Sequence, residues 1–331
     1  MIISRTPFRI SFAGGGTDLP SYYLKDDGQV ISTTIDKCIY VAVKRQTAIA
    51  EYKYRINWSK VEFKNHIDDI EHPIVREALR LMKIDFPLEV STFADIPAQT
   101  GLGSSSAFAV GLLHALHALK GEMVTKGSLA ADAAKLEIDI LGRKIGKQDH
   151  YSAAYGNINI FGFHKNGHVS VDPVFYKPET KLAIESHLML FYTALKRDAN
   201  EILKIQSENT LNKYNVLYEM KCQVDTIREI LSSGENLHDF GQVLNKGWQL
   251  KKSLVDTISS SEIDHYYNAA IEAGARGGKL LGAGGGGFLL FYVEPKNQQN
   301  VKKKLSDLYE MPFSFDTGGG TRITYYDQER F

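Results

Sequence analysis

Hydrophobic and polar positions near the start of the chain follow patterns typical of strands and turns. Apolar runs predict strands over residues 2–12 and 30–45, and a polar–apolar alternation predicts further strand structure over 51–63. Residues 74–83 have helical spacing, and a strand-like run over 88–93 then leads into a loop. The N-terminal part of the chain therefore predicts a sheet with helices added to it.

The middle of the chain is mostly helical. Residues 104–119, SSSAFAVGLLHALHAL, have helical spacing and are apolar on most faces, which predicts a largely buried helix. A second helix is predicted over 126–143 and a third from about Lys147, followed by a strand over 157–163.

The best candidate for a boundary between two lobes is the stretch 165–180, which contains Asn166-Gly167 and two prolines. We therefore predict lobes of residues 1–175 and 176–331 in an α+β fold. The elements predicted beyond the boundary are a strand over 187–194, helices over 199–231, 237–254 and 262–273, a strand over 287–293, a helix over 296–308 and a strand over 322–326.

Size and composition support two lobes and narrow the class of protein. The 331 residues exceed the roughly 250–300 at which single cores stop growing. Lys plus Arg (39) balance Asp plus Glu (39), so nothing predicts a nucleic-acid or membrane partner. The sequence shows no signal-peptide pattern and no apolar run long enough to span a membrane. Cys38 and Cys222 are expected to be buried apolar residues in a reducing compartment. We therefore expect a cytoplasmic protein. The oligomeric state stays open.

The most informative segment is PAQTGLGSSSAFAVG, residues 97–111, in which a glycine-rich turn leads into the buried helix. Glycines let successive N–H groups point into one concavity, and the helix N-terminus adds free donors, so the segment predicts a phosphate site. A plain serine N-cap is the alternative, and no GK[ST] follows, so this is no Walker A loop. The residues predicted to bind the nucleotide are Pro97, Gly101, Leu102, Gly103, Ser104, Ser105 and Ser106.

A second glycine-rich segment, LGAGGGGF over residues 281–288, formally matches the dinucleotide fingerprint GxGxxG. That fingerprint needs a strand before it and a helix after it, whereas here a helix is predicted before and a strand after. A dehydrogenase is therefore disfavoured. Adjacent glycines instead predict a backbone surface pressed against a ligand or the opposite lobe.

The third segment, AGGGTD over residues 13–18, follows the first predicted strand. Its glycines permit close approach of a substrate, and Asp18 could accept hydrogen bonds from sugar hydroxyls. An Asx turn is the alternative for Asp18.

Together the segments TPFRISFAGGGTD, PAQTGLGSSSA and KLLGAGGGGF resemble, in order and position, the three motifs of the GHMP kinases. The resemblance implies an N-terminal ATP-binding lobe like the second domain of ribosomal protein S5 and a ferredoxin-like C-terminal lobe. ATP and a sugar would meet between the lobes, with Mg²⁺ as the metal.

Within the family, AGGGTD resembles the fucokinase and heptose-phosphate kinase branch. This implies phosphorylation of the anomeric hydroxyl of D-glycero-D-manno-heptose 7-phosphate, giving the 1,7-bisphosphate for nucleotide-activated heptose biosynthesis. The alternatives are a kinase for another sugar, such as L-fucose or galactose, and a catalytically silent sugar or nucleotide sensor.

The resemblance also implies catalytic roles. Ser105 and Glu137 would bind magnesium, Asp149 would lie near the attacking hydroxyl, and Arg9 would lie beside Asp149. For Glu137 the helical pattern agrees, since residues three and four positions away are apolar and a carboxylate there needs a partner. A structural buried glutamate is the alternative.

The same resemblance implies a set of substrate-binding residues. These are Gly14, Gly15, Gly16, Thr17, Asp18, Arg197, Gly284, Gly285 and Gly286. Arg197 would bind the phosphate of a phosphorylated sugar, and less specific candidates for that role are Arg5, Lys147, Arg276 and Arg322.

Overall fold

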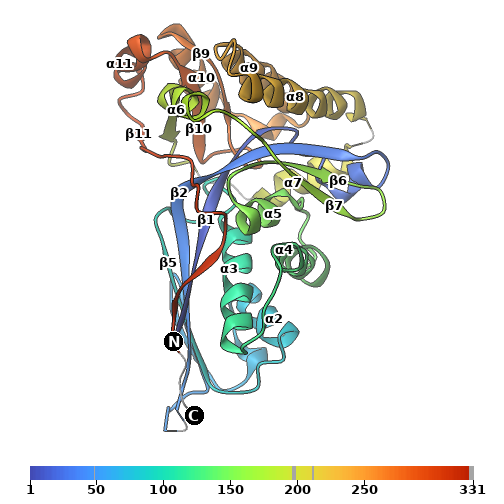
Figure 1. Cartoon of the computed structure of the whole chain (residues 1–331), viewed down its shortest axis with the longest axis vertical. Coiled ribbons are helices and arrows are strands. Elements are labelled where there is room, and N and C mark those ends of the chain that lie inside the picture. Colours follow the sequence, from blue (N-terminus) through green and yellow to red (C-terminus); the bar gives the residue numbers. More distant parts are fainter. Residues whose placement is uncertain (48, 196–198, 211, 328–331) are drawn as a thin grey trace.

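Two lobes lie end to end along the long axis of the molecule (Figure 1). The structure is a computed structural model that describes residues 1–47, 49–195, 199–210 and 212–327. An eight-stranded sheet forms the N-terminal lobe, and a four-stranded sheet lies in the C-terminal lobe. Among the described helices, none has the length and apolar character needed to cross a membrane.

The larger sheet is built on two long antiparallel strands, β1 (Ile2–Ala13) and β2 (Gly28–Arg45). The first part of β2 also pairs with β6, and its second part pairs with β5, so the sheet branches at β2. The strand order is β12-β1-β2-β5-β3-β4, with β6 and β7 off this path. The bounds are β3 Tyr54–Asn57, β4 Val61–Lys64, β5 Leu88–Ala94, β6 Ile158–Phe163, β7 Val169–Pro173 and β12 Arg322–Tyr326.

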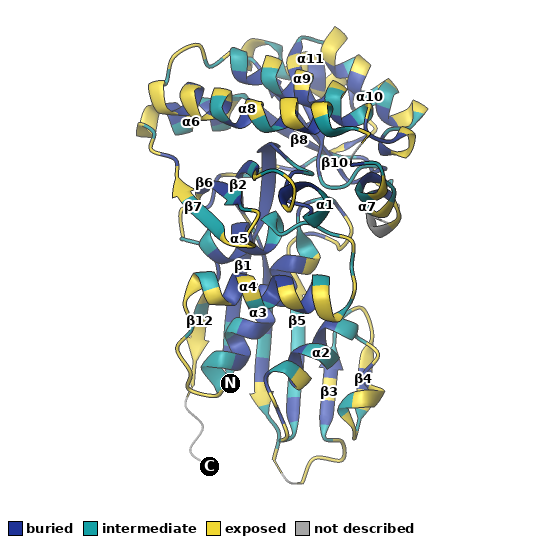
Figure 2. Cartoon of the chain, turned by 90° about the vertical axis from the view of Figure 1, so that its right-hand side faces the viewer, coloured by how far each residue is buried: buried dark blue, intermediate teal, exposed yellow. Residues whose placement is uncertain are grey.

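Helices cover one face of this sheet (Figures 1 and 2). They are α2 Pro73–Leu81, α3 Ser104–Leu119, α4 Lys126–Lys135 and α5 Gln148–Tyr155, with the short α1 Pro20–Tyr23 and η1 Ile67–Asp69 in connections. The buried helix predicted over 104–119 is α3, whose residues from Ser106 to Leu113 are all buried. Burial of this apolar helix against β1 and β2 is the main source of the core of this lobe.

The C-terminal lobe has an antiparallel sheet of order β11-β8-β10-β9. Figure 2 shows its helices with their outward faces exposed. The strands are β8 Leu188–Tyr192, β9 Ala275–Leu280, β10 Phe288–Val293 and β11 Tyr309–Glu310. The helices are α6 Pro178–His187, α7 Ala199–Glu208, α8 Tyr214–Ser233, α9 Asp239–Lys252, η3 Asp256–Ile258, α10 Ser261–Glu272 and α11 Pro295–Lys304.

The two lobes are packed together at the end of β1. The Phe12 ring lies edge-on to Phe240 of α9, with centroids 5.1 Å apart, and 6.0 Å from Phe315. The chain then returns to the first lobe, where β12 pairs with β1. A single hydrophobic cluster therefore runs from the large sheet into the helices of the C-terminal lobe. The predicted division at residue 175 stays a prediction.

Several predicted elements differ from those observed. The helix predicted over 199–231 is two helices, α7 and α8. Apolar residues have helical spacing on both sides of the break, so the pattern did not reveal it. The helix predicted over 126–143 is α-helical to Lys135 and continues as a π-helix, η2 Leu136–Ile140. The prediction of a helix directly before the segment 281–288 is wrong, because strand β9 precedes it. The predicted strand after it is β10, so the segment joins two strands. Cys38 is buried as expected, but Cys222 is exposed.

Candidate active site at the junction of the lobes

The turn before α3 presents the start of that helix to the junction of the lobes. Gly101 and Gly103 have φ values of 82° and 77°, in the left-handed region that glycine adopts readily. The N–H of Ala107 donates to the carbonyl of Gly103, so the N–H groups of Ser104, Ser105 and Ser106 precede the first main-chain bond of α3. Such free donors at the positive end of a helix dipole can bind a phosphate group.

The other two predicted residues of this turn have structural contacts. Leu102 is fully buried, and its carbonyl accepts the N–H of Arg9 at 3.1 Å. Pro97 is exposed, and its carbonyl accepts the Thr100 hydroxyl at 3.2 Å. These bonds hold the turn in place against β1.

The serine hydroxyls do not cap α3 but bind Glu137. Ser105 Oγ donates to Glu137 Oε1 at 2.6 Å, and Ser106 Oγ donates to Oε2 at 2.8 Å. His150 Nε2 lies 2.8 Å from Oε2. One guanidinium nitrogen of Arg143 contacts both Ser105 Oγ, at 2.6 Å, and Glu137 Oε1. We refer to Glu137, Ser105, Ser106, Arg143 and His150 as the Glu137 cluster.

Glu137 is fully buried in the π-helix η2, a helix type that often occurs at functional sites. Burial alone would raise its pKa, but the hydrogen bond and charge of His150, with Ser105 and Arg143, lower the pKa to about 2. The carboxylate is therefore charged at neutral pH. Its oxygens and Ser105 Oγ are hard ligands of the kind that Mg²⁺ prefers.

The described residues contain no group of three or more His, Cys, Asp or Glu side chains suited to a metal ion. A cation at Ser105 and Glu137 would therefore take its other ligands from phosphate and water. The Arg143 guanidinium already places a positive charge between these two side chains.

Arg9 and Asp149 form a bidentate ion pair beside the same turn. Arg9 Nε and Nη2 donate to the two carboxylate oxygens of Asp149, each at 2.7 Å, and Arg9 Nη1 donates to the carbonyl of Gly101 at 2.6 Å. Asp149 lies in the first turn of α5, where the helix dipole favours a carboxylate. The Arg9 side chain is 4% exposed and that of Asp149 is 22% exposed, so the carboxylate is the accessible member.

Gly103 lies against this pair, and its φ of 77° is a conformation that residues other than glycine rarely adopt. A Cβ there would lie 3.2 Å from Asp149 Oδ2 and 3.3 Å from Arg9 Cγ. The turn before α3 and the ion pair are thus in direct contact.

The first glycine turn is tied to α5 through Asp18. Its carboxylate accepts the N–H of Gly16 at 2.9 Å and of Gln148 at 3.2 Å. Burial and the charge of Asp149 raise the pKa of Asp18. Thr17 is buried too, and its hydroxyl donates to the carbonyl of Gly14 at 2.8 Å. The predicted role of these residues in sugar binding stays a prediction.

The third glycine segment is where main chains of different elements meet. A Cβ on Gly282 would lie 2.4 Å from Gly101 Cα, and one on Gly287 would lie 2.3 Å from the Thr100 oxygen. On Gly284 and Gly286 a Cβ would meet the carbonyl oxygens of Ile258 and Leu195 at 2.9 and 2.3 Å. The segment is therefore pressed against the opposite lobe and its own. Sugar contact by Gly284, Gly285 and Gly286 stays a prediction.

Two buried lysines, which we call the lysine pair, were missed by sequence reasoning. Lys279 Nζ donates to the Phe12 carbonyl at 3.0 Å, and Lys251 Nζ donates to the carbonyls of Leu280, at 3.1 Å, and Gly282. Burial and the charge of Arg9 lower the pKa of Lys279 to about 7, and burial with Lys279 and Arg9 lowers that of Lys251. A signal existed for Lys251, which shares a helical face with buried Leu244 and Trp248.

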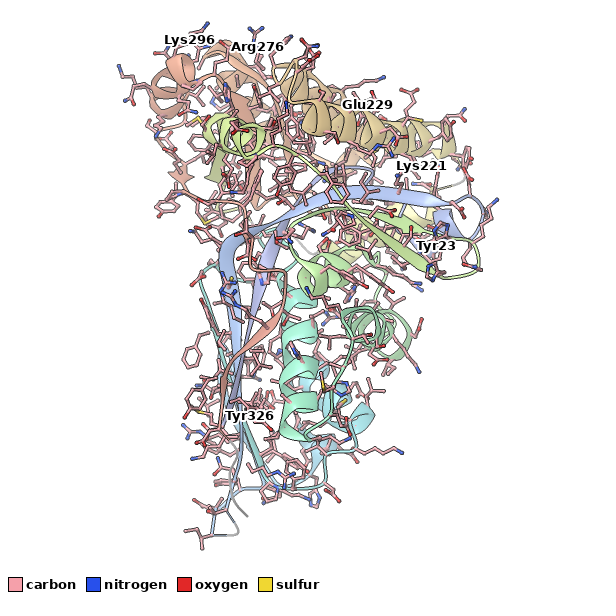
Figure 3. The ribbon with its side chains drawn as sticks, in the orientation of Figure 1. Tyr23, Lys221, Glu229, Arg276, Lys296 and Tyr326 are labelled. Carbon is pink, nitrogen blue, oxygen red and sulfur yellow. The ribbon has the colours of Figure 1, made fainter. Side chains whose placement is uncertain are left out.

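The predicted phosphate ligand Arg197 lies outside the described residues. Of the less specific candidates, Lys147 is in the site region, where its Nζ lies 4.8 Å from the centre of the Tyr23 ring. Arg276 is bonded to Glu294 at 2.8 Å on the outer side of the C-terminal lobe, far from Tyr23 (Figure 3). Arg5 is paired with Asp316, and Arg322 lies on β12.

Comparison with known proteins matches two family models, the GHMP kinases N terminal domain over residues 73–157 and the GHMP kinases C terminal domain over residues 191–310. A D-glycero-alpha-D-manno-heptose 7-phosphate kinase of Campylobacter jejuni is 31% identical, over 96% of this chain and 97% of that protein. The chain belongs to the GHMP kinase family. It is thus an ATP-dependent sugar kinase, as the three glycine segments predicted.

Other relatives agree with this family. An L-fucokinase/L-fucose-1-P guanylyltransferase of Bacteroides fragilis is 28% identical over 93% of this chain, which spans 36% of that longer protein. The crystal structure of a D-glycero-D-manno-heptose 1-phosphate kinase from Bacteroides thetaiotaomicron superimposes with a TM-score of 0.80, at 24% identity, over 98% of this chain and 100% of that one. The predicted two-lobed α+β GHMP kinase fold is confirmed.

Proposed function

We propose that this GHMP kinase transfers the γ-phosphoryl group of ATP to the anomeric hydroxyl of D-glycero-D-manno-heptose 7-phosphate, giving the 1,7-bisphosphate. The sugar is suggested by the 31% identical relative, whose name carries that substrate. The catalytic part of this proposal rests on the bidentate Arg9–Asp149 pair. This pair contacts the turn before α3 and lies near the first glycine turn.

Asp149 would orient the attacking hydroxyl and accept its proton. Its carboxylate is the accessible member of the ion pair, and Arg9 would add positive charge beside the transferring group. The free N–H groups at the start of α3 would hold the polyphosphate. Phosphoryl transfer depends chiefly on such positioning and charge stabilisation.

Mg²⁺, when bound, would neutralise charge on the phosphate oxygens. Ser105 Oγ and Glu137 Oε1 would hold it, because both are oxygen donors that already share one cationic partner, Arg143. The low pKa of Glu137 keeps this carboxylate ready to bind a cation across the physiological range.

A second candidate acceptor is L-fucose, which is favoured by the 28% identical relative that is an L-fucokinase. Asp149, Arg9, Ser105 and Glu137 would play the same roles with either acceptor, so they do little to select the sugar.

The experiment that tests the acceptor is an ATP-consumption screen with heptose 7-phosphates, free heptoses, L-fucose and galactose. We expect the heptose 7-phosphate to be turned over with the highest kcat/KM. Preferential turnover of L-fucose would replace the first proposal by the second.

Asp149→Asn tests the catalytic assignment. We expect kcat to fall by about 10²–10⁴-fold, with ATP affinity changed little, because the amide cannot accept the proton. Asp132→Asn, at a half-buried position of α4, is the matched control. Near-normal turnover by the Asp149 variant would reject the assignment.

A further inference from the structure

The three glycines of the first turn differ in why they are glycine. Gly14 and Gly16 have φ values of 84° and 97°, and a Cβ on them would lie 2.0 Å from the Gln29 oxygen and 2.5 Å from Gln206 Nε2. Gly15 lies outside the left-handed region, and a Cβ on it would have no neighbour closer than 3.8 Å. The fold therefore requires glycine at the two outer positions but not at the central one.

The space beside Gly15 is lined by polar atoms that lack partners. Its two nearest atoms are Ser11 Oγ and Gln148 Nε2, each 3.8 Å from the Cβ position. Ser11 is 6% exposed, and its hydroxyl has no hydrogen-bond partner among the described residues. The buried Oε1 of Gln148 also lacks one. Buried polar atoms are normally satisfied, so this arrangement indicates a ligand that supplies the missing bonds.

The space adjoins the groups that carry out the transfer. Ser11 follows Arg9 by two residues on β1, so both side chains project from the same face of the strand. Gln148 immediately precedes Asp149 in the first turn of α5. Figure 1 shows α5 beside β1 close to where the two lobes meet.

The chemistry of these atoms matches a hydroxyl group. A hydroxyl can accept from Gln148 Nε2 while it donates to Ser11 Oγ. A phosphate group would instead be repelled by two nearby carboxylates, since Asp18 accepts the Gln148 N–H and Asp149 follows Gln148 in the chain.

We propose that Ser11 Oγ and the Gln148 side chain bind one hydroxyl of the acceptor sugar, next to the hydroxyl held by Asp149, and that Gly15 leaves the room for it. This inference rests on the proposed function in taking a sugar as the acceptor. It adds two specificity-determining residues to the reaction, neither of them part of the phosphate-binding turn.

Gly15→Ala is the most direct test, because its methyl group would make only ordinary contacts and would strain no backbone. With D-glycero-D-manno-heptose 7-phosphate as the probe, we expect the acceptor KM to rise about tenfold or more, with the KM for ATP unchanged within about twofold. Ser11→Ala and Gln148→Leu should each raise the acceptor KM about threefold to tenfold. Because both side chains bind one hydroxyl, the variant that combines Ser11→Ala with Gln148→Leu should raise the acceptor KM by less than the product of the two single-variant factors.

Ser91→Ala on β5 and Gln249→Leu on the exposed face of α9 are matched controls that should leave both KM values unchanged. If the space holds only a water molecule, the Ser11 and Gln148 variants will leave the acceptor KM unchanged, and this inference is wrong while the proposed function stands. If the wild-type protein phosphorylates no sugar or sugar phosphate, both fail together.

Discussion

On the α4 side of the turn before α3, the buried carboxylate of Glu137 is surrounded by side-chain partners from Ser105, Ser106, His150 and Arg143. On the β9 side, the lysine pair has only main-chain carbonyls as hydrogen-bond partners among the described residues. The positive charge of Arg9 acts on both lysines and lowers the pKa of each. The Glu137 carboxylate thus has polar and charged side-chain partners without a ligand, whereas the lysine pair has main-chain partners alone among the described residues.

This difference indicates what each side contributes. A buried charge with complete partners stabilises its surroundings, whereas buried like charges cost free energy until an anion approaches. Lys251 holds the carbonyl of Gly282, and Gly282 packs on Gly101 in the turn before α3. On the proposed function, the lysine pair would respond to a polyphosphate bound at that turn, and the Glu137 cluster would hold its cation.

Glu137→Gln should have the largest effect. We expect kcat to fall by about 10²–10³-fold and the protein to lose stability, because a neutral amide binds a cation more weakly than a carboxylate and its NH₂ group cannot accept from the surrounding donors. Glu272→Gln, on the exposed face of α10, is the control.

The pKa of Glu137 is lowered, so its carboxylate contributes stability above about pH 4.5 that is lost as pH falls toward 2. Urea unfolding from pH 6 to pH 3 should show this slope in the wild type and a weaker slope in the variant.

Lys279→Met should weaken ATP binding about tenfold and yet raise the melting temperature by about 2 °C or more, because a buried charge without a counter-ion is replaced by an apolar side chain. Calorimetry and thermal unfolding measure the two quantities, with Lys303→Met on the surface of α11 as control. A fall in both stability and affinity would show that the ammonium group serves mainly as a structural bridge to Phe12.

The affinity for ATP should change a few-fold with pH because of Lys279, whereas the charge of Glu137 should not change over the same range. Lys279 has a pKa of about 7 and faces Arg9 and Lys251, and a bound polyphosphate favours its protonated form. Affinity should therefore be highest below pH 7 and fall as pH rises above 7, with proton uptake on binding. Calorimetry in buffers of different ionisation enthalpy measures that uptake. An unchanged pH profile in Lys279→Met would assign the effect to another group.

Arg143→Gln should have the smallest effect. Loss of the guanidinium frees Ser105 Oγ and Glu137 Oε1, so we expect Mn²⁺ to bind about threefold more tightly in the absence of nucleotide. Electron paramagnetic resonance of free Mn²⁺ measures this directly, and Arg228→Gln on the surface of α8 is the control. Weaker metal binding would mean that Arg143 orients the carboxylate for the metal instead of competing with it.

Sequence reasoning performed well where local pattern and motif coincide. The bounds of α3 were predicted from its apolar spacing. Motif matches selected Ser105, Glu137, Arg9 and Asp149, which the structure brings together in two contacting pairs, and their catalytic roles stay predictions. It failed where long-range contacts decide the structure. The π-helix at Glu137, strand β9 and the split between α7 and α8 leave no distinct period in the sequence.

The local sequence pattern likewise did not predict which groups contact the buried charged side chains. His150 and Arg143 meet Glu137 through the path of the chain after η2, and Lys279 meets Phe12 from the opposite lobe. Nothing in the composition around these residues distinguishes them from surface charges.

By itself, the sequence determined the mixed α+β class and helix α3 through short-range periodicity, and its three glycine-rich motifs indicated the family by resemblance. Only the tertiary structure decided which glycine of the first turn the backbone does not require and which buried charged groups lack a counter-ion. Those properties depend on distances between atoms far apart in the chain, and such distances exist only once the lobes have packed.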